Sequence, residues 1–223
     1  MQKEVLKYKN LQYALSVPNS FDEEKKYPVI IFLHGAGTRG YDEKPLVNNA
    51  YFELTDPEEY NAVTFAPQCY ADSWFDIFEQ LQDFINFAID HKFVDKDRVY
   101  VIGASMGGYA TWQIAMTMPE KFAAIVPICG GGMYWNAERI KNIKVWAFHG
   151  TEDIYVYPSE SKNMVEAINK VGGDARLTVY EGVGHGSWLN AYSSKELFEW
   201  LFNQSLKKRD KAENKFDDEK IFG

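Results

Sequence analysis

The sequence contains little cysteine, with 2 residues, Cys69 and Cys129, in a chain of 223. Two cysteines this far apart form no CxxC pair and no Cys/His spacing of the kind that binds zinc. We therefore expect no metal ion in this protein. Nothing else in the sequence calls for a cofactor, so we expect none.

Positive charge is also scarce. The 24 Lys and Arg residues are outnumbered by 32 Asp and Glu residues, which gives a formal net charge of -8 and a pI near 5.1. A nucleic-acid-binding protein needs a basic surface. This composition therefore argues against nucleic acid as a partner.

Long apolar runs are missing as well. No segment approaches the roughly 20 consecutive apolar residues of a membrane-spanning helix, so we expect no membrane association. Residues 1–9 lack the apolar stretch of a secretion signal. This predicts a cytoplasmic protein, unless such a signal has been removed. The sequence leaves the oligomeric state open.

What the sequence does contain is a regular alternation of short apolar runs and helical stretches. Hydrophobic residues make up 46% of the chain and aromatic residues 16%, which is enough for a folded core. The apolar runs span residues 11–17, 29–33, 62–66, 99–102, 123–128, 145–148 and 177–180. The helical stretches span residues 76–91, 106–118, 159–171 and 191–203. Nearly continuous apolar strands between helices predict an α/β protein whose mostly parallel sheet is covered on both faces.

The length of the chain predicts a single α/β domain. We assign residues 1–205 to one catalytic domain. Residues 206–223 mix charges of both signs with few apolar residues, which predicts a charged C-terminal tail. No insertion is long enough for a large lid, although residues 130–142 are a candidate for a small rim.

The clearest functional motif lies at residues 103–107, Gly-Ala-Ser-Met-Gly, between an apolar strand and a helical stretch. This is the layout of a nucleophile elbow, in which a serine on strained backbone projects its hydroxyl into solvent. The chain folds back on itself there, so Gly103 and Gly107, two positions before and after Ser105, must be tiny. The alternative is a glycine-rich turn with an incidental serine.

A serine nucleophile needs a base and an acid that orients the base, and in this fold class the chain order is Ser, then Asp or Glu, then His. His185 lies in a glycine-flanked loop after a strand, which leaves it free to reach Ser105. Asp153 lies in the loop after an earlier strand and is the favoured acid. Its neighbour Glu152 is the competitor, although it is more consistent with a solvated loop charge.

The choice of base is narrow because the chain has only 4 histidines. We interpret His91, at the end of an amphipathic helix, as a solvent-facing residue or one that interacts with the C-terminal end of the helix dipole. We interpret His149, at the end of a strand, as structural. His34 precedes the serine and is therefore in the wrong order for the base. We expect it to brace the loop that follows it.

An oxyanion hole needs two N–H donors, one from the residue after the nucleophile and one from the loop after an early strand. The first is Met106, at the start of a helix, where the helix dipole favours developing negative charge. The second candidate is Ala36, in a glycine-rich loop after the strand at 29–33. For Met106, side-chain packing in the core is the alternative interpretation.

Further motifs accompany these, and together the set resembles a compact α/β-hydrolase of the carboxylesterase type, close to bacterial feruloyl and acetyl esterases and predicted peptidases. The segments that carry the resemblance are Leu33-His-Gly-Ala-Gly-Thr-Arg-Gly40, Ala66-Pro-Gln-Cys69, Asp97-Arg-Val-Tyr-Val-Ile-Gly-Ala-Ser-Met-Gly-Gly108, Pro127-Ile-Cys-Gly-Gly-Gly132, Trp146-Ala-Phe-His-Gly150 and Gly184-His185-Gly-Ser-Trp188. One departure is Thr38, where related sequences commonly have glutamate. The resemblance implies the α/β-hydrolase fold and acetyl or hydroxycinnamoyl esters of plant polysaccharides as substrates.

The strand order usual for this architecture also bears on the two cysteines. It implies that Cys69 and Cys129 end strands separated by two others, on the order of 14 Å apart at a strand spacing near 4.8 Å. A disulfide needs Cα atoms within about 7 Å. We therefore expect both thiols to be free.

Three residues are candidates to line an acyl or alcohol pocket. Gln68 and Trp74 follow a strand that ends at the sheet edge where the elbow opens, and Trp188 follows the base. The alternative for each tryptophan is packing against the scaffold.

The sequence thus predicts a metal-independent serine esterase that acts on small-molecule or polysaccharide-linked esters, with Ser105 as nucleophile, His185 as base and Asp153 as acid. A small peptidase, an acyl thioesterase or a lysophospholipase would use the same three residues. The alternative from another class is a noncatalytic binding protein on a hydrolase scaffold. The intact trio argues against it, because such a scaffold has no physical need for all three residues.

Overall fold

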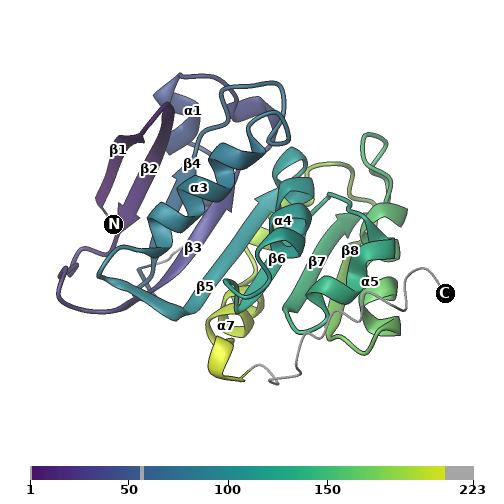
Figure 1. Ribbon diagram of the computed structural model, residues 1–223. Helices are drawn as coiled ribbons and strands as arrows, with labels where there is room; N and C mark the ends of the chain where they lie inside the picture. Colours follow the sequence, from purple (N-terminus) through teal and green to yellow (C-terminus); the bar gives the residue numbers. More distant parts are fainter. Residues whose placement is uncertain (1, 56–57, 209–223) are drawn as a thin grey trace.

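The computed structural model describes residues 2–55 and 58–208, and its centre is an eight-stranded sheet with helices on both faces (Figure 1). The strands are β1 (Gln2–Tyr8), β2 (Leu11–Val17), β3 (Tyr27–Leu33), β4 (Val63–Pro67), β5 (Val94–Ala104), β6 (Ala124–Ile128), β7 (Lys144–Gly150) and β8 (Ala175–Tyr180). They lie in the order β1-β2-β4-β3-β5-β6-β7-β8. β2 runs antiparallel to β1 and β4, and all other neighbours are parallel. This confirms the predicted α/β-hydrolase fold with a mostly parallel sheet.

The helices divide between the two faces of this sheet. One face is covered by α3 (Phe78–Ile89), α4 (Met106–Thr117) and α5 (Ser159–Lys170), which lie in front of the strands in Figure 1. The other face is covered by α1 (Glu43–Val47), α2 (Ala50–Leu54), α6 (Trp188–Tyr192) and α7 (Lys195–Phe202). Each set buries its apolar side chains against the sheet, so two core layers enclose the central strands.

The prediction of one helix over residues 191–203 is wrong. The chain forms α6 and α7 instead, which meet at Ser193 and Ser194. Ser194 has an extended backbone, and its hydroxyl accepts a hydrogen bond from the Leu197 N–H at 3.2 Å. A serine in this conformation caps the start of a new helix, so the helical pattern is interrupted there.

The strand β1 was not predicted, because it does not read as an apolar run. It is an edge strand that mixes charged and apolar residues and leaves its side chains exposed or half-buried. It is held by pairing with β2 in a hairpin. Charged side chains on an edge strand discourage pairing with other chains.

The site is positioned by the carboxyl ends of the parallel strands, which meet at one edge of the sheet. The loops after β3, β5, β7 and β8 all open there and carry residues 34–38, Ser105, Asp153 and His185. Residues far apart in the chain therefore share one edge, as in open α/β sheets in general.

The strand order also accounts for the cysteines. Cys69 follows β4 and Cys129 follows β6, and β3 and β5 lie between these strands. Both thiols are buried and free, as predicted.

The predictions on membrane-spanning segments and on the C-terminal tail can be compared with the described residues only. Within residues 2–55 and 58–208, no helix is long and apolar enough to cross a membrane. Of the predicted tail, residues 206–208 form a short 3₁₀ helix beside β5, where Lys207 pairs with Asp97. The remainder, 209–223, lies outside the described residues, so the division at residue 205 stays a prediction.

Candidate active site

The turn after β5 has the geometry of a nucleophile elbow. Ser105 has φ 56° and ψ −118°, a strained conformation for a residue with a side chain. A Cβ on Gly107 would lie 1.8 Å from the Leu33 carbonyl oxygen, and a Cβ on Gly103 would lie 2.2 Å from the Gly107 carbonyl oxygen. These distances are impossible for real atoms, so both glycines are sterically required, as predicted.

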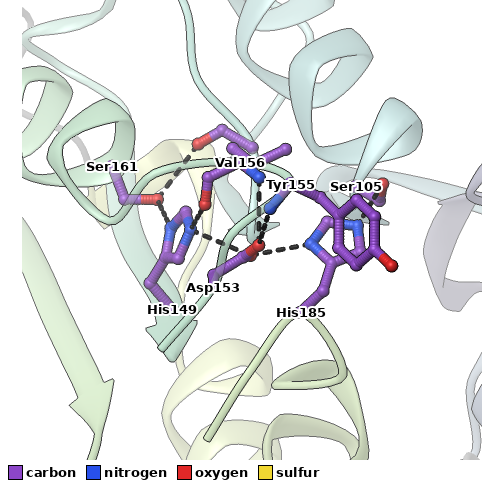
Figure 2. A network of polar contacts seen from close by, with 8 residues as sticks. Ser105, His149, Asp153, Tyr155, Val156, Ser161 and His185 are labelled. Atoms are coloured by element: carbon purple, nitrogen blue, oxygen red, sulfur yellow. Dashed lines mark hydrogen bonds and ion pairs between the residues drawn. The ribbon is translucent and has the colours of Figure 1, made fainter. Parts of the chain in front are cut away.

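The structure brings Ser105, His185 and Asp153 into one line of hydrogen bonds (Figure 2). The Ser105 Oγ lies 2.8 Å from His185 Nε2. The His185 Nδ1 lies 2.7 Å from Asp153 Oδ2. With Nδ1–H donating to the carboxylate, Nε2 is left as the acceptor for the serine proton. Glu152, the competing acid, is exposed to solvent.

The carboxylate of Asp153 is buried but well supplied with donors. Its Oδ1 accepts hydrogen bonds from the N–H groups of Tyr155 at 3.0 Å and Val156 at 2.9 Å. Burial opposes ionisation, but the hydrogen bonds from His185, Val156 and Tyr155 outweigh it and hold the pKa of Asp153 below its ordinary value. The residue is therefore a carboxylate at neutral pH.

A second histidine lies on the other side of Asp153. His149, at the end of β7, is completely buried, and its Nε2 lies 2.9 Å from the Val156 carbonyl oxygen and 3.3 Å from Asp153 Oδ2. Its Nδ1 lies 2.7 Å from the Ser161 hydroxyl. The ring is therefore part of the polar network around the acid, which its position at the end of a strand did not reveal.

The loop proposed for the oxyanion hole passes close to the nucleophile. A Cβ on Gly35 would lie 3.5 Å from the Ser105 Cβ, and Ala36 lines the same cavity as Ser105. Among the described residues, the backbone N–H groups of Ala36 and Met106 have no acceptor. Two free N–H groups at the nucleophile are the donors that an oxyanion needs.

His34 holds this loop in place. It is buried, its Nδ1 lies 2.6 Å from the Gly35 carbonyl oxygen, and its Nε2 accepts a hydrogen bond from the Cys69 N–H at 2.9 Å. Burial lowers the pKa of His34 to about 4. The ring is therefore neutral near pH 7, with the proton on Nδ1, and it ties the loop after β3 to the end of β4. The bracing role expected for His34 matches this arrangement.

Gln68 and Trp74 do not line the pocket, which corrects the sequence prediction. The Gln68 Nε2 donates to the carbonyl oxygens of Thr38 at 2.8 Å and Asp42 at 2.9 Å. The Trp74 Nε1 donates to the His34 carbonyl oxygen at 3.1 Å. Both side chains are buried behind the loop and use their polar atoms to hold its backbone. They lie near the expected edge of the sheet, but neither lines the cavity.

A cavity of about 340 Å³ opens beside Ser105. One wall is the loop at residues 35–38, and the remainder is largely aromatic. The aromatic residues are Phe32, Tyr51, Trp188 and Tyr192. Of the predicted substrate-binding residues, Trp188 is the one among them. Its ring packs edge-on against that of His185, with 5.4 Å between the ring centroids. The other three escaped the sequence analysis, because Phe32 belongs to a strand and Tyr51 and Tyr192 belong to helical turns of five residues.

The outer margin of the site carries exposed apolar side chains. In the loop after Asp153, Ile154 and Tyr155 are 75% and 78% exposed, and the Tyr155 ring lies 5.5 Å from that of His185. The segment 130–142, predicted as a candidate rim, does not line the cavity. Its 3₁₀ helix (Tyr134–Ile140) packs on α4 and α5, and Arg139 donates a hydrogen bond to the Met116 carbonyl oxygen near the end of α4 that is remote from Ser105. The cavity therefore remains open, without a large lid among the described residues.

One group near the triad has the side chains of a metal site. Cys129, Asp153 and His185 present ligand atoms within 4.8 Å of one another in the described chain. Two of these, however, already bond to each other. Burial raises the pKa of the Cys129 thiol to about 12, so the thiol is protonated near pH 7 and is a poor ligand. The geometry thus favours hydrogen bonding over coordination at this place.

The chain is similar in sequence to known hydrolases. The sequence model of the dienelactone hydrolase family matches residues 39–213. Among curated proteins, dipeptidyl-peptidase 5 of Porphyromonas gingivalis is 20% identical over 242 residues. That match takes in 86% of this chain and 35% of the peptidase, so the chain spans about a third of that relative's length.

Two solved structures extend the comparison. A thermostable esterase is 33% identical with a TM-score of 0.78, over 92% of this chain and 63% of that one. A feruloyl esterase module from Clostridium thermocellum, complexed with sinapinate, is 17% identical with a TM-score of 0.68, over 91% of this chain and 88% of that one. At that identity, the second likeness establishes the shared fold.

Proposed function

This chain belongs to the dienelactone hydrolase family of the α/β-hydrolase superfamily, and from that premise we propose that it is a serine hydrolase that cleaves carboxylic esters through an acyl-enzyme. The observation that carries the proposal is the line of hydrogen bonds from Ser105 through His185 to Asp153. The likeness to a thermostable esterase supports it.

In the proposed mechanism, the Ser105 Oγ attacks the ester carbonyl carbon while His185 Nε2 takes the hydroxyl proton. Asp153 accepts the Nδ1–H bond throughout and stabilises the imidazolium. The carbonyl oxygen becomes an oxyanion and accepts hydrogen bonds from the N–H groups of Ala36 and Met106. Each such donor contributes roughly 3 to 4 kcal/mol in comparable enzymes.

The intermediate then collapses. The C–O bond to the alcohol breaks, and the imidazolium of His185 gives its proton to the leaving oxygen. In the second half, His185 takes a proton from water, the hydroxide adds to the acyl carbon, and the proton returns to the Ser105 oxygen as the acid leaves. No metal ion or cofactor is needed for this sequence of steps.

For the substrate, we propose acetyl or hydroxycinnamoyl esters of plant-derived carbohydrate. The aromatic walls at Phe32, Tyr51 and Tyr192 suit a flat aryl acyl group, because aromatic rings prefer offset or edge contacts with one another. The likeness to a feruloyl esterase module supports the hydroxycinnamoyl class. The open margin of the site, where Ile154 and Tyr155 face solvent, suits an ester attached to a polymer.

The test is hydrolysis of p-nitrophenyl esters from acetate to laurate, together with methyl ferulate, by the wild type and by Ser105→Ala. We expect turnover in the wild type and its loss in the variant at unchanged fold, because no other residue supplies the attacking oxygen. The dependence of turnover on the length of the acyl chain then indicates how large an acyl group the cavity accepts. Equal turnover in both proteins would contradict the proposal.

A peptidase is the second candidate, favoured by the similarity to dipeptidyl-peptidase 5. It would use the same three residues, with an amine as the leaving group. Matched p-nitroanilide and p-nitrophenyl ester substrates with the same acyl group separate the two. A higher kcat/KM for the anilide would favour the peptidase.

A further inference from the structure

The loop that carries Asp153 is not held by packing of its outer side chains. Ile154, Tyr155 and Tyr157 are between 67% and 78% exposed. A loop with so little buried apolar surface opens easily unless polar contacts hold it. Yet the carboxylate of Asp153 has to meet His185 at hydrogen-bond distance.

The contact beneath this loop comes from His149. Its Nε2 lies 2.9 Å from the Val156 carbonyl oxygen and 3.3 Å from Asp153 Oδ2, on the side opposite His185 (Figure 2). A carbonyl oxygen only accepts hydrogen bonds, so Nε2 must carry a proton and donate it. The Nε2–H of His149 therefore faces both the Val156 carbonyl oxygen and Asp153 Oδ2, the oxygen that His185 also contacts.

The other side of the His149 ring is tied to the elements behind the nucleophile. Its Nδ1 lies 2.7 Å from the Ser161 hydroxyl oxygen on α5, and that oxygen lies 3.0 Å from the Gly130 carbonyl oxygen. Gly130 in turn packs against α4, since a Cβ on it would lie 2.6 Å from the Gly108 carbonyl carbon. The imidazole thus connects the acid loop to the helix that begins at the elbow.

We propose that His149 is a positioning residue for the acid of the triad: its Nε2–H fixes the loop at Val156 and holds the Asp153 carboxylate in the rotamer that faces His185. The inference rests on the proposed function, because positioning matters only if the triad works. It gives His149 a role beyond filling the core, although the residue touches neither substrate nor Ser105.

Two matched substitutions separate positioning from packing. The amide nitrogen of His149→Gln superimposes on Nε2 and keeps the donor toward Val156 and Asp153. The amide of His149→Asn superimposes on Nδ1 and keeps the contact with Ser161. His149→Leu removes both. Gln and Asn each retain one of the two buried contacts, so a purely structural role predicts similar losses for them.

The proposal predicts different losses. His149→Asn and His149→Leu should lower kcat for p-nitrophenyl acetate roughly ten- to a hundredfold, the usual result of a small misplacement of a catalytic group. KM should stay within about twofold, because His149 does not line the cavity. His149→Gln should recover most of kcat, even where its melting temperature equals that of His149→Asn. Equal kcat losses in the Gln and Asn variants would overturn the proposal.

A second measurement does not depend on turnover. Proton NMR of the full chain should show the His185 Nδ1–H far downfield in the wild type and in His149→Gln, since that proton bonds to a fixed carboxylate. In His149→Asn it should move upfield or exchange with water. An unchanged resonance in His149→Asn would overturn the inference. If the wild type hydrolyses no ester, the proposed function fails, and this resonance still decides the role of His149.

Discussion

Ser105 depends on small neighbours that have no chemistry of their own. The chain passes so close to itself at the elbow that a Cβ on Gly103 or Gly107 would overlap a backbone oxygen atom. The reactive hydroxyl is thus exposed by a turn that only these residues allow. Backbone strain at functional sites persists where surrounding structure enforces it.

Substitution at Gly107 tests this dependence. Gly107→Ala should lower the free energy of unfolding by about 1 to 3 kcal/mol or more and reduce activity, because its Cβ would clash with the Leu33 carbonyl oxygen. The control is Gly37→Ala, whose Cβ meets nothing within 4 Å and whose stability should change by less than about 0.5 kcal/mol. Urea unfolding of both variants gives the comparison. Equal stability of the two would contradict the account of the elbow.

His34 predicts a specific dependence of stability on pH. Its pKa in the folded protein is about 4, whereas in the unfolded chain it is near 6.5. Between these values the unfolded state binds one more proton. Stability therefore falls as the pH is lowered, by about 1.4 kcal/mol per unit from this residue, and His34 adds no such slope above pH 6.5.

The measurement is urea unfolding of the wild type and His34→Gln between pH 4.5 and 7.5. The variant loses the hydrogen bonds that hold the loop, so it should be less stable at neutral pH. Its free energy of unfolding should also depend less steeply on pH below pH 6.5, by about 1.4 kcal/mol per pH unit, because one titrating group is missing. Identical slopes would mean that His34 does not titrate as described.

Prediction of single residues succeeded where chain order and local sequence were sufficient. The Ser, Asp, His order picked out three residues that the structure brings within hydrogen-bond distance. It failed for Gln68 and Trp74, since proximity to the sheet edge does not say which way a side chain faces. The orientation of Gln68 depends on the carbonyl oxygens of Thr38 and Asp42, and that of Trp74 on the carbonyl oxygen of His34. These acceptors are distant in sequence from the side chains that they hold.

At the scale of elements, the short helix α2 forms a wall of the cavity. Five residues are too few for a stable helix by themselves. The side chain of Asn49 accepts hydrogen bonds from the N–H groups of Tyr51 and Phe52 and donates to the carbonyl oxygens of Pro45 and Leu46. This amide therefore joins α1 to α2 and holds Tyr51 in the wall of the cavity.

Asn49→Ala should lower the free energy of unfolding by about 1 kcal/mol, the usual cost of a lost helix cap. It should also raise KM for an aryl ester while kcat changes little, since the triad is untouched. Asn49→Asp is the matched control: it keeps the acceptor for the two N–H groups and should retain most of the stability. An unchanged KM in the alanine variant would show that α2 does not contribute to substrate binding.

Long, strongly patterned elements could be predicted from the sequence, and short ones could not. The inner strands are continuous apolar runs that are buried on both faces. The helices α3 and α5 carry a clear helical periodicity because each buries one face, whereas α4 is buried or half-buried all around. The helices α1 and α2 depend on the side-chain caps of Asp42 and Asn49 rather than on pattern. The division between α6 and α7 likewise depends on one serine hydroxyl.

At the scale of the whole molecule, the sheet order creates the site. The strands β5, β7 and β8 deliver Ser105, Asp153 and His185 to one edge, although these residues span 80 positions between Ser105 and His185. The two histidines His149 and His185 then meet one carboxylate from opposite sides (Figure 2). The fold was predictable from alternation of strands and helices, but the aromatic cavity was not, since its walls come from both core and loop segments.

The central claim is that Ser105 is a nucleophile activated by this arrangement. A fluorophosphonate probe tests it most directly, because the serine oxygen displaces fluoride and forms a stable adduct. We predict one adduct per chain, located by peptide mass spectrometry on Ser105, absent from Ser105→Ala and absent after unfolding in urea. Labelling at another residue such as Cys129, or no labelling of the folded protein, would contradict the account.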